Sequence, residues 1–463
     1  MSRQQSRDQR QAAFVKLATD LHTQLEEWYD HHPAASLGEI EQEARRLRRE
    51  FMGQGLAVVI NGRDTGFQLD VPRCPQCAQS MQFVGYRPWR VSGLEGETEL
   101  ERAYYVCRDC EEQTLFPLDQ KLNLRADHWS AGAARVATRQ GLQAKSFALA
   151  AESYRDAIGG SMSPDSQRRL TEGWGQDVAE CREDEARRAS APVAVGESPR
   201  TQCVVEVEPI TTQASVSTDG AMVLIREEGW KEVKVVAVSE VGVHEAGERA
   251  RDAARPSRRD DDPLVALSRH SYQAGLWDAD TFAPYQYAEG LRRGLDHCAH
   301  VTSTNDGAPW IERVTRLNFP EVPQIIDWSH AAQHVWTVAN AVQGEQTPAA
   351  QHWADTQLDA LWDGQVAEVV QTLDRLHLEQ EAYPPLAHQA PDYFRLRQKQ
   401  MQYDQFRAKG WPIGSGVVES AANTVVHHRL KRPGRGWKRE YAQAMLAALC
   451  ELHSHRFERT WQA

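Results

Sequence analysis

The chain carries near its centre the stretch Gln213-Ala-Ser-Val-Ser-Thr-Asp219-Gly-Ala-Met, which predicts a strand that ends in an acidic residue at a glycine turn. A β-rich stretch follows from Trp230 to Ser239. Two further short strands are expected to end in an acid, at Asp306 and at Asp327. A lone Asp-Gly pair usually marks only a turn. Strand ends of an α/β sheet converge on one rim, however, so the three acids are predicted to share a site.

A helix-rich region separates these strands from a further acid. Apolar residues recur at helical spacing from Ala331 to Tyr403, which predicts an all-helical insertion over 331–403. A glycine-punctuated turn then opens a helix in Trp411-Pro-Ile-Gly-Ser-Gly-Val-Val-Glu419. Glu419 is therefore expected to lie in the first turns of a helix.

Glu419 leads into the densest basic patch of the chain, between His427 and Arg439. This patch contains no acid, and its basic residues are Arg429, Lys431, Arg432, Arg435, Lys438 and Arg439. Such a patch is predicted to hold a DNA backbone, because lysine and arginine neutralise phosphates. Two aspartates at strand ends and a glutamate on a later helix are the arrangement that two-metal phosphoryl transfer needs, since hard carboxylate oxygens suit Mg²⁺.

Cysteine spacing predicts a metal site nearer the N-terminus. Four of the 8 cysteines form two C-x-x-C pairs, Cys74-Pro-Gln-Cys77 and Cys107-Arg-Asp-Cys110. The residues between them, Met81 to Arg90 and Glu99 to Val106, look like the two strands of a hairpin. Two such pairs at the ends of a hairpin complete a closed Cys₄ site for structural zinc, so we expect a zinc ribbon in preference to unligated thiols or disulfides.

The N-terminal segment is predicted to form two helices. Apolar residues from Phe14 to Trp28 line one helix face, and Ser36 with Glu39 has the spacing of a capping box before the second helix. We expect this hairpin to pack on its own domain or on a second subunit, with direct DNA contact as the less favoured alternative.

A helix-turn-helix is predicted after the zinc ribbon. Helical patterns at 131–142 and 146–158 are followed by a glycine turn and by a helix that Ser163 would cap. Arg168 and Arg169, next to Ser166 and Gln167, would lie where a recognition helix contacts bases and phosphates. An ordinary helical hairpin is the alternative.

Composition shifts suggest boundaries between these parts. The expected parts are an N-terminal helical region at 1–70, the zinc ribbon at 71–125, the helix-turn-helix region at 126–180, a linker at 181–210, an α/β domain at 211–330 and 404–463, and the helical insertion at 331–403. The charged stretch Glu245 to Pro263 is expected to be a solvated loop and not a metal site.

Composition sets broader limits. With 463 residues, 41% of them hydrophobic and 25% charged, the chain has the make-up of a water-soluble protein of several domains. A net charge of −12 argues against a polycation that coats nucleic acid indiscriminately. No membrane-spanning or secretory segment is recognised, and the cysteines are not spread as a disulfide framework, so a cytoplasmic location is expected.

Four blocks of the sequence resemble bacterial insertion-sequence transposases of the DDE superfamily, the Kra-type group. The blocks are Ser217-Thr-Asp219-Gly-Ala-Met, Asn305-Asp306-Gly-Ala-Pro-Trp, Ile326-Asp327-Trp-Ser-His330 and Pro412-Ile-Gly-Ser-Gly-Val-Val-Glu419-Ser, followed by a run that ends in Arg-Pro-Gly-Arg-Gly-Trp437. The resemblance covers about residues 74–450. It implies an RNase H-like catalytic domain, a mixed sheet flanked by helices with a helical insertion.

The resemblance also implies the roles of the site residues. Asp219, Asp306 and Glu419 would hold two Mg²⁺ ions, for which Mn²⁺ could substitute, while Asp327 and His330 match an accessory D-x-x-H block that supports the site or the transfer steps. The enzyme would bind terminal inverted repeats, cut the ends of the element and join them to target DNA as a homo-oligomer, in association with the bacterial nucleoid.

Three alternatives stay open at this point. The chain could be a sequence-specific DNA-binding protein derived from a transposase and lacking catalysis, or an RNase H-like nuclease that cuts DNA without joining it. The third concerns Asp327 and His330 only, which could simply be a capped helix start with a packed histidine.

Overall fold

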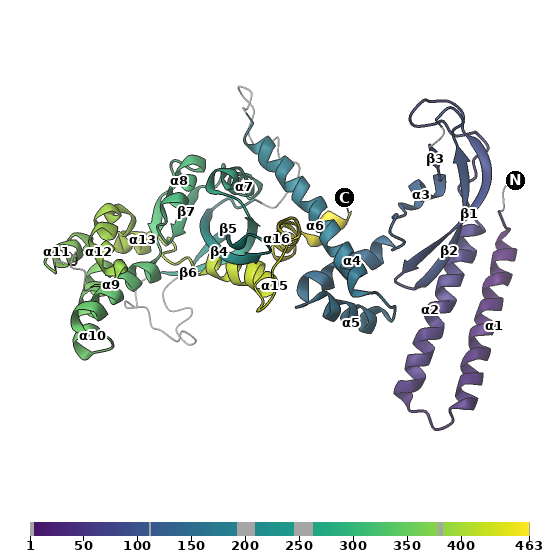
Figure 1. Ribbon diagram of the computed structural model, residues 1–463, viewed down its shortest axis with the longest axis horizontal. Helices are drawn as coiled ribbons and strands as arrows, with labels where there is room; N and C mark the ends of the chain where they lie inside the picture. The colour runs from purple at the N-terminus through teal and green to yellow at the C-terminus, as the bar shows by residue number, and fades with distance from the viewer. Residues whose placement is uncertain are drawn as a thin grey trace. The chain divides into compact units, whose positions relative to one another are not determined.

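The computed structural model describes residues 4–110, 113–191, 209–244, 263–376, 378 and 383–462. The chain divides into two compact units, Met1–Thr171 and Glu172–Ala463 (Figure 1). Within the described residues, every helix is too short or too polar to cross a membrane.

A helical hairpin opens the N-terminal unit. It consists of α1 (Arg7–His31) and α2 (Leu37–Asn61), and each helix begins with a capping box. Ser36 and Glu39 form the box predicted from the sequence, and Ser6 with Gln9 forms a second one. The apolar stripe of α1 is only half-buried against α2, where Phe14 meets Phe51 edge-on at 5.1 Å.

Three antiparallel strands follow the hairpin. They are β1 (Gln82–Gly93), β2 (Gly96–Val106) and β3 (Thr114–Leu115), in the order β1-β2-β3, and the short helix α3 (Pro117–Leu122) comes next. Helix α2 packs so closely on β2 that any side chain at Gly53 would collide with the backbone of Glu97.

Three helices follow: α4 (Ala131–Gln143), α5 (Phe147–Ile158) and α6 (Pro164–Ala189). Helix α6 begins in the N-terminal unit, and its residues from Glu172 on belong to the C-terminal unit. Gly159 ends α5 with a φ of 78°, and Ser163 caps α6 by accepting a hydrogen bond from the Ser166 amide at 3.0 Å. Helix α6 continues well beyond Trp174, so residues 181–189 of the expected linker are helical. Residues 192–208 of that linker and most of the charged stretch 245–263 lie outside the described residues.

A five-stranded mixed sheet forms the centre of the C-terminal unit, in the order β6-β5-β4-β7-β8. The antiparallel strands are β4 (Gln213–Ile225), β5 (Gly229–His244) and β6 (Leu264–Gly275), whereas β7 (His300–Asn305) and β8 (Gln324–Ile326) run parallel to β4. Asp219 therefore differs from the sequence prediction. It lies inside β4 opposite Val235, because β5 keeps the strand paired beyond Gly220 to Ile225.

Helices cover both faces of this sheet (Figure 1). On one face α7 (Ala279–Arg292) and α8 (Pro309–Asn318) pack against Val216 and Val236. A second group contacts strands β4, β5 and β6, namely α14 (Gly416–Ala421), the π-helical η3 (Ala422–His427) and α16 (Arg439–His453). The short α15 (His428–Leu430) continues η3. The short α17 (Phe457–Gln462) is the last helix.

The region between β8 and α14 is helical. Its elements are α9 (Trp328–Gln343), α10 (Pro348–Trp362), α11 (Val366–Asp374), α12 (Pro385–Leu396), η2 (Gln398–Gln400) and α13 (Tyr403–Ala408). They share a core around Val335, Leu361 and Phe394, against which Trp336 and Trp353 pack.

Six buried charged side chains close a ring of ion pairs in the C-terminal unit. In order around the ring they are Arg182, Glu185, Arg292, Glu289, Arg456 and Glu451. Each arginine contacts two glutamates and each glutamate two arginines, and the residues come from α6, α7, α16 and the turn after α16. This ring explains why α6 extends through a charged segment that looks solvated in the sequence.

Candidate functional site

The four predicted zinc cysteines lie together in the N-terminal unit. Their four Sγ atoms, those of Cys74, Cys77, Cys107 and Cys110, all lie within 4.8 Å of one another. The Sγ atoms of Cys77 and Cys107 are 3.5 Å apart. A tetrahedral zinc ion with Zn–S bonds of about 2.3 Å needs sulfur atoms at about this spacing. The cluster could therefore hold a structural zinc ion.

Backbone hydrogen bonds shape the two cysteine turns. The Ala78 amide donates to the Cys74 carbonyl at 2.9 Å, and the Gln113 amide donates to the Cys110 carbonyl at 2.7 Å. Hydrogen bonds, that of the Cys77 backbone amide first, lower the pKa of the Cys74 thiol to about 7, whereas the Cys77 side chain raises the pKa of Cys110 to about 12. The cluster alone therefore favours a thiolate, the form that binds a metal, at Cys74, and the charge of a bound cation would favour the others.

Asp219 lies within β4 and Asp306 directly follows β7, and the two residues occupy corresponding positions of these parallel strands. The last residue pair of this ladder is Val216 with Ser303, and each acid lies shortly beyond it. Asn305 extends the connection, because its Oδ1 accepts a hydrogen bond from the Thr218 amide at 2.6 Å. The two acids are thereby held on adjacent strands, just beyond the last paired residues of β4 and β7.

The environment of Asp219 disfavours its charged form. Burial is the largest cause that raises the pKa of this carboxyl, and the charges of Asp306 and Glu419 add to it. The Gly220 amide and His330 oppose the rise, and the net pKa is about 6. A half-buried group of like-charged carboxylates is unfavourable by itself, and a bound cation relieves the repulsion.

Asp327 is the N-cap of α9 and also the partner of His330. Its Oδ1 accepts hydrogen bonds from Ser329 and from the His330 amide, and the Nδ1 atom of His330 lies 3.3 Å from the same oxygen. Its Oδ2 accepts a hydrogen bond from the Ser415 amide. Burial would raise the pKa of Asp327, but the bonds from His330, Ser329 and Ser415 outweigh it and hold the pKa well below the usual range.

The hydrogen-bonding capacity of Asp327 is thus largely used within the protein, and its side chain is 1% exposed. The hydrogen bond to Asp327 raises the pKa of His330 and orients the ring, which leaves Nε2 as the nitrogen not engaged by Asp327. Ligand atoms of Asp327, His330 and Glu419 lie within 4.8 Å of one another, a spacing at which they could bind a metal ion.

The segment before α14 connects Glu419 to the strand ends. The Trp328 amide donates to the Ile413 carbonyl at 2.9 Å, and Thr304 donates its hydroxyl to the Pro412 carbonyl at 2.8 Å. With the bond from Ser415 to Asp327, these contacts fix the start of the helix that carries Glu419. The helix then widens into the π-helical η3, a departure frequent at functional sites.

The helical region contributes two side chains that the sequence reasoning missed. Tyr393 donates its hydroxyl to the Asp306 carbonyl at 3.1 Å, and Arg397 donates to the Gly307 carbonyl at 2.9 Å. Gly307 has a φ of 87°, and the Asp306 carboxylate accepts a hydrogen bond from the Ala308 amide at 2.8 Å. No spacing in the sequence connects α12 with this turn, because helices α8, α9, α10 and α11 lie between them along the chain.

The predicted DNA contacts of the basic patch divide into two groups. Arg429 differs from the expectation, because it is 2% exposed and lies over the Trp437 ring. Burial, then the nearby charge of Arg435, lowers the pKa of Arg429 to about 10. Arg439 pairs with Glu228 at 2.7 Å. Four of the predicted residues are exposed or half-exposed on the loop that follows α15: Lys431, Arg432, Arg435 and Lys438.

The start of α6 also differs in part from the sequence prediction. Gln167 is buried and donates its amide to the Ala137 carbonyl, so it is not available to a base edge. Arg168 and Arg169 are accessible, and both form ion pairs with Asp165, at 2.8 and 3.2 Å. Asp165 therefore offsets part of the positive charge at this helix end.

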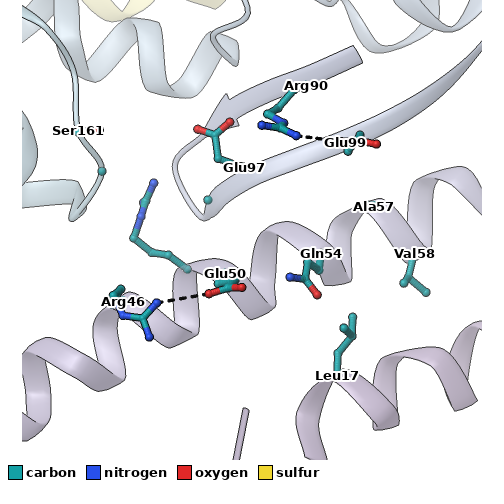
Figure 2. Close-up of a pocket in the computed structure, with 13 residues that line it drawn as sticks. Leu17, Arg46, Glu50, Gln54, Ala57, Val58, Arg90, Glu97, Glu99 and Ser161 are labelled. Atoms are coloured by element: carbon teal, nitrogen blue, oxygen red, sulfur yellow. Dashed lines mark hydrogen bonds and ion pairs between the residues drawn. The ribbon is translucent and has the colours of Figure 1, made fainter. Parts of the chain in front are cut away.

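A separate pocket of about 600 Å³ lies in the N-terminal unit, between α1, α2 and the β1–β2 hairpin (Figure 2). Its charged lining is largely compensated, since Arg46 pairs with Glu50 at 3.5 Å and Arg90 with Glu99 at 3.2 Å. None of the predicted site residues lines this pocket.

Comparison with models of known protein families finds no match. Comparison with curated proteins finds no significantly similar sequence.

Proposed function

We propose that this protein is a DDE-type DNA transposase that binds the ends of an insertion sequence, cuts them and joins them to target DNA. The observation that carries the proposal is that residues far apart in the sequence are brought together. Asp219 and Asp306 lie at matching positions of the neighbouring strands β4 and β7. Ligand atoms of Asp327, His330 and Glu419 lie within 4.8 Å of one another. The quoted sequence blocks that resemble such transposases contain these same residues. In this proposal the mixed sheet, its flanking helices and the helical region before α14 are an RNase H-like catalytic domain with its insertion.

The donor set suits Mg²⁺, with Mn²⁺ as a substitute, because the three acids offer hard oxygen ligands. Asp219, Asp306 and Glu419 would hold the ions. When bound, such ions activate water or a 3′ hydroxyl and stabilise the leaving 3′ oxygen. The protein contributes the geometry: Asn305 and Tyr393 hold the Asp306 turn, and Ser415 and Asp327 hold the start of the Glu419 helix and the His330 ring.

The chemistry requires two successive in-line displacements. In the first, water attacks the scissile phosphorus, the bond to the 3′ oxygen breaks, and the freed strand keeps a 3′ hydroxyl. In the second, that hydroxyl attacks a phosphorus of the target strand and displaces the target's own 3′ oxygen. His330 lies close enough to Asp306 and Glu419 for their charges to raise its pKa, and it would interact with the phosphate or the leaving oxygen through Nε2.

The remaining modules would recognise DNA. The cysteine cluster would hold zinc in a ribbon, α4 to α6 would act as the helix-turn-helix with Arg168 and Arg169 at its exposed end, and the loop with Lys431, Arg432, Arg435 and Lys438 would hold phosphates. We propose double-stranded terminal repeats and target DNA as substrates and a homo-oligomer as the active form, acting at the bacterial nucleoid in the cytoplasm.

The test is Mg²⁺-dependent cleavage and joining of a labelled DNA fragment that carries the flanking ends of the element. We expect the wild type to give cut and joined products, and Glu419→Gln and Asp306→Asn to bind the same ends without giving either. Glu312→Gln is the matched control, because Glu312 is an acid on α8 that is not one of the three proposed metal ligands. This variant should still give both the cut and the joined products.

Two outcomes would contradict the proposal. Specific binding of the ends by the wild type, with no cleavage in Mg²⁺ or Mn²⁺, would indicate a DNA-binding protein without catalysis. Cleavage that never yields joined DNA would indicate a nuclease.

A further inference from the structure

An exposed aromatic side chain lies at the far end of the β4–β5 hairpin. Trp230 is 55% exposed and Met222 is 43% exposed. Trp230 pairs with Leu224 and Met222 with Glu232, so the two exposed side chains are diagonal neighbours on one face of the hairpin. Asp219 lies on the opposite face, because side chains alternate along a strand.

The basic loop after α15 is fastened to this end of the hairpin. The Trp437 amide donates to the Leu224 carbonyl at 3.0 Å, and the Arg226 amide donates to the Trp437 carbonyl at 2.7 Å. The loop reverses at Pro433 and Gly434, the latter with a φ of 71°. Its backbone position is therefore set by strand β4 and by a tight turn.

One cation lies beside the exposed ring, and further basic residues follow on the same loop. The Nζ atom of Lys431 lies 5.9 Å from the centre of the Trp230 ring, and Arg435 and Lys438 are exposed on the same loop. Two acids at this end of the hairpin have cationic partners, since Glu232 pairs with Lys234 and Glu228 with Arg439, whereas Glu227 is exposed in the turn. We name Met222, Trp230, Lys431, Arg435 and Lys438 together the Trp230 platform.

We propose that the Trp230 platform binds single-stranded DNA, with an unpaired base stacked on the Trp230 ring and the basic loop on the adjoining phosphates. The choice of DNA rests on the proposed function. An aromatic ring in a basic surface is how proteins bind single strands, because every base has a π face and the backbone is anionic. Inside a duplex, neighbouring bases cover those faces, so the platform should prefer unpaired or terminal bases.

The platform can be tested apart from the carboxylates. Asp219 and Leu224, the partner of Trp230, are five residues apart on β4, which is about 16 Å at a strand's rise per residue. Trp230 is largely exposed, so its replacement should leave the fold intact. The probes are a labelled oligothymidylate and a blunt duplex of equal length, with binding followed by fluorescence anisotropy in the full-length protein.

We expect Trp230→Ala to weaken oligothymidylate binding roughly tenfold, since stacking on an aromatic side chain contributes about 1–3 kcal/mol per base. Trp230→Phe should recover most of the loss and Trp230→Leu should not, because only phenylalanine keeps a π face. Duplex binding should change little in all three. Lys431→Gln should reduce the dependence of log affinity on log salt by roughly 0.7. Tyr29→Ala, at an exposed aromatic of α1, is the control without effect.

The outcomes separate this inference from the proposed function. If Trp230→Ala and Trp230→Leu bind oligothymidylate as tightly as the wild type, the platform is not a single-strand site, whatever the enzyme cuts. If Trp230→Ala instead lowers the mass of the protein in sedimentation with single-strand affinity unchanged, the surface contacts a second copy and the inference fails. If the wild type never cuts DNA but the Trp230 series behaves as expected, the inference stands and the catalytic proposal falls.

Discussion

Two groups of side chains in the C-terminal unit contain carboxyl groups whose pKa values are shifted in opposite directions. In the buried ring, each glutamate lies between two arginines, and Arg456 followed by Arg292 overcomes the effect of burial to lower the pKa of Glu289 to about 2. Asp219 in β4 has no such partners among the described residues, so burial, with a smaller contribution from the charges of Asp306 and Glu419, raises its pKa to about 6.

The difference shows that cationic partners, more than the depth of burial, determine the pKa of a carboxyl group. Glu289 is more deeply buried than Asp219, yet it is the more strongly acidic of the two. A carboxylate with its full set of cationic partners fixes the positions of helices. Carboxylates that lack such partners store an unfavourable interaction, which a bound cation converts into affinity.

Removing one arginine from the ring should produce the largest effect. Arg456→Met leaves Glu289 and Glu451 buried with one arginine fewer each, so we expect the free energy of unfolding to fall by about 3–5 kcal/mol. Urea denaturation followed by circular dichroism measures the change.

The matched control is an exposed arginine of the same unit. Arg395 pairs with Asp374 at 2.6 Å with both side chains nearly half exposed, so Arg395→Met should cost about 0–1 kcal/mol. Equal losses for Arg456→Met and Arg395→Met would mean that the ring has no special role.

Acid should weaken the ring over a defined range of pH. The pKa of Glu289 is about 2 in the folded protein against an ordinary value of 4.5, so its contribution is complete above about pH 4.5 and is lost as the pH falls toward 2. The contribution is of the order of 3 kcal/mol. We expect Glu289→Gln to be less stable than the wild type at neutral pH, with the difference shrinking below about pH 4. A constant difference across this range would contradict the prediction.

The contribution of Asp219 to stability should depend on pH in the opposite direction. The folded pKa of Asp219 is raised, so its favourable contribution is present below about pH 4 and is lost as the pH rises through about 6. In EDTA at neutral pH, Asp219→Asn should therefore stabilise the protein by about 1 kcal/mol, with no gain near pH 4. Unfolding with and without Mg²⁺ provides the readout, because only the wild type should gain from the ion. Destabilisation by Asp219→Asn in EDTA at neutral pH would refute the expected repulsion.

The smallest effect should come from the tyrosine that holds the Asp306 turn. Tyr393→Phe removes one hydrogen bond to the Asp306 carbonyl, so we expect Mn²⁺ affinity, measured by calorimetry, to fall about fivefold, the equivalent of about 1 kcal/mol. Tyr403→Phe loses a similar bond to the Ile326 carbonyl, at 3.1 Å, and is the control. It should lower stability alone. Equal loss of Mn²⁺ affinity in both variants would rule out specific positioning by Tyr393.

Local patterns predicted much of the local structure. The capping box at Ser36, the strand ending just before Asp306 and the grouping of the four cysteines all depend on residues close in sequence or on fixed ligand spacing. The position of Asp219 inside β4 was not predictable in this way. A glycine after an acid is typical of a turn, and here only pairing with β5 keeps the strand extended.

Other features depend on partners distant in the chain. Arg182 and Glu185 look solvated in the sequence, and their burial follows from Glu451 and Arg292 on other helices. Arg429 is a residue type that often contacts phosphates, but its side chain is buried within the fold. Tyr393 reaches Asp306 only because α12 folds back over the strand ends. These contacts are tertiary, so no periodicity or spacing encodes them.

The helical region between β8 and α14 starts and finishes at nearly the same place. The hydroxyl of Tyr403, near its end, lies 3.1 Å from the carbonyl of Ile326, just before its start, and the helices between share a core of their own. A segment with adjoining ends can be lengthened, shortened or exchanged during evolution while the strands at its base keep their places. Tyr393 and Arg397 then mark the limit of that freedom, since a replacement segment would have to supply its own means of holding the Asp306 turn.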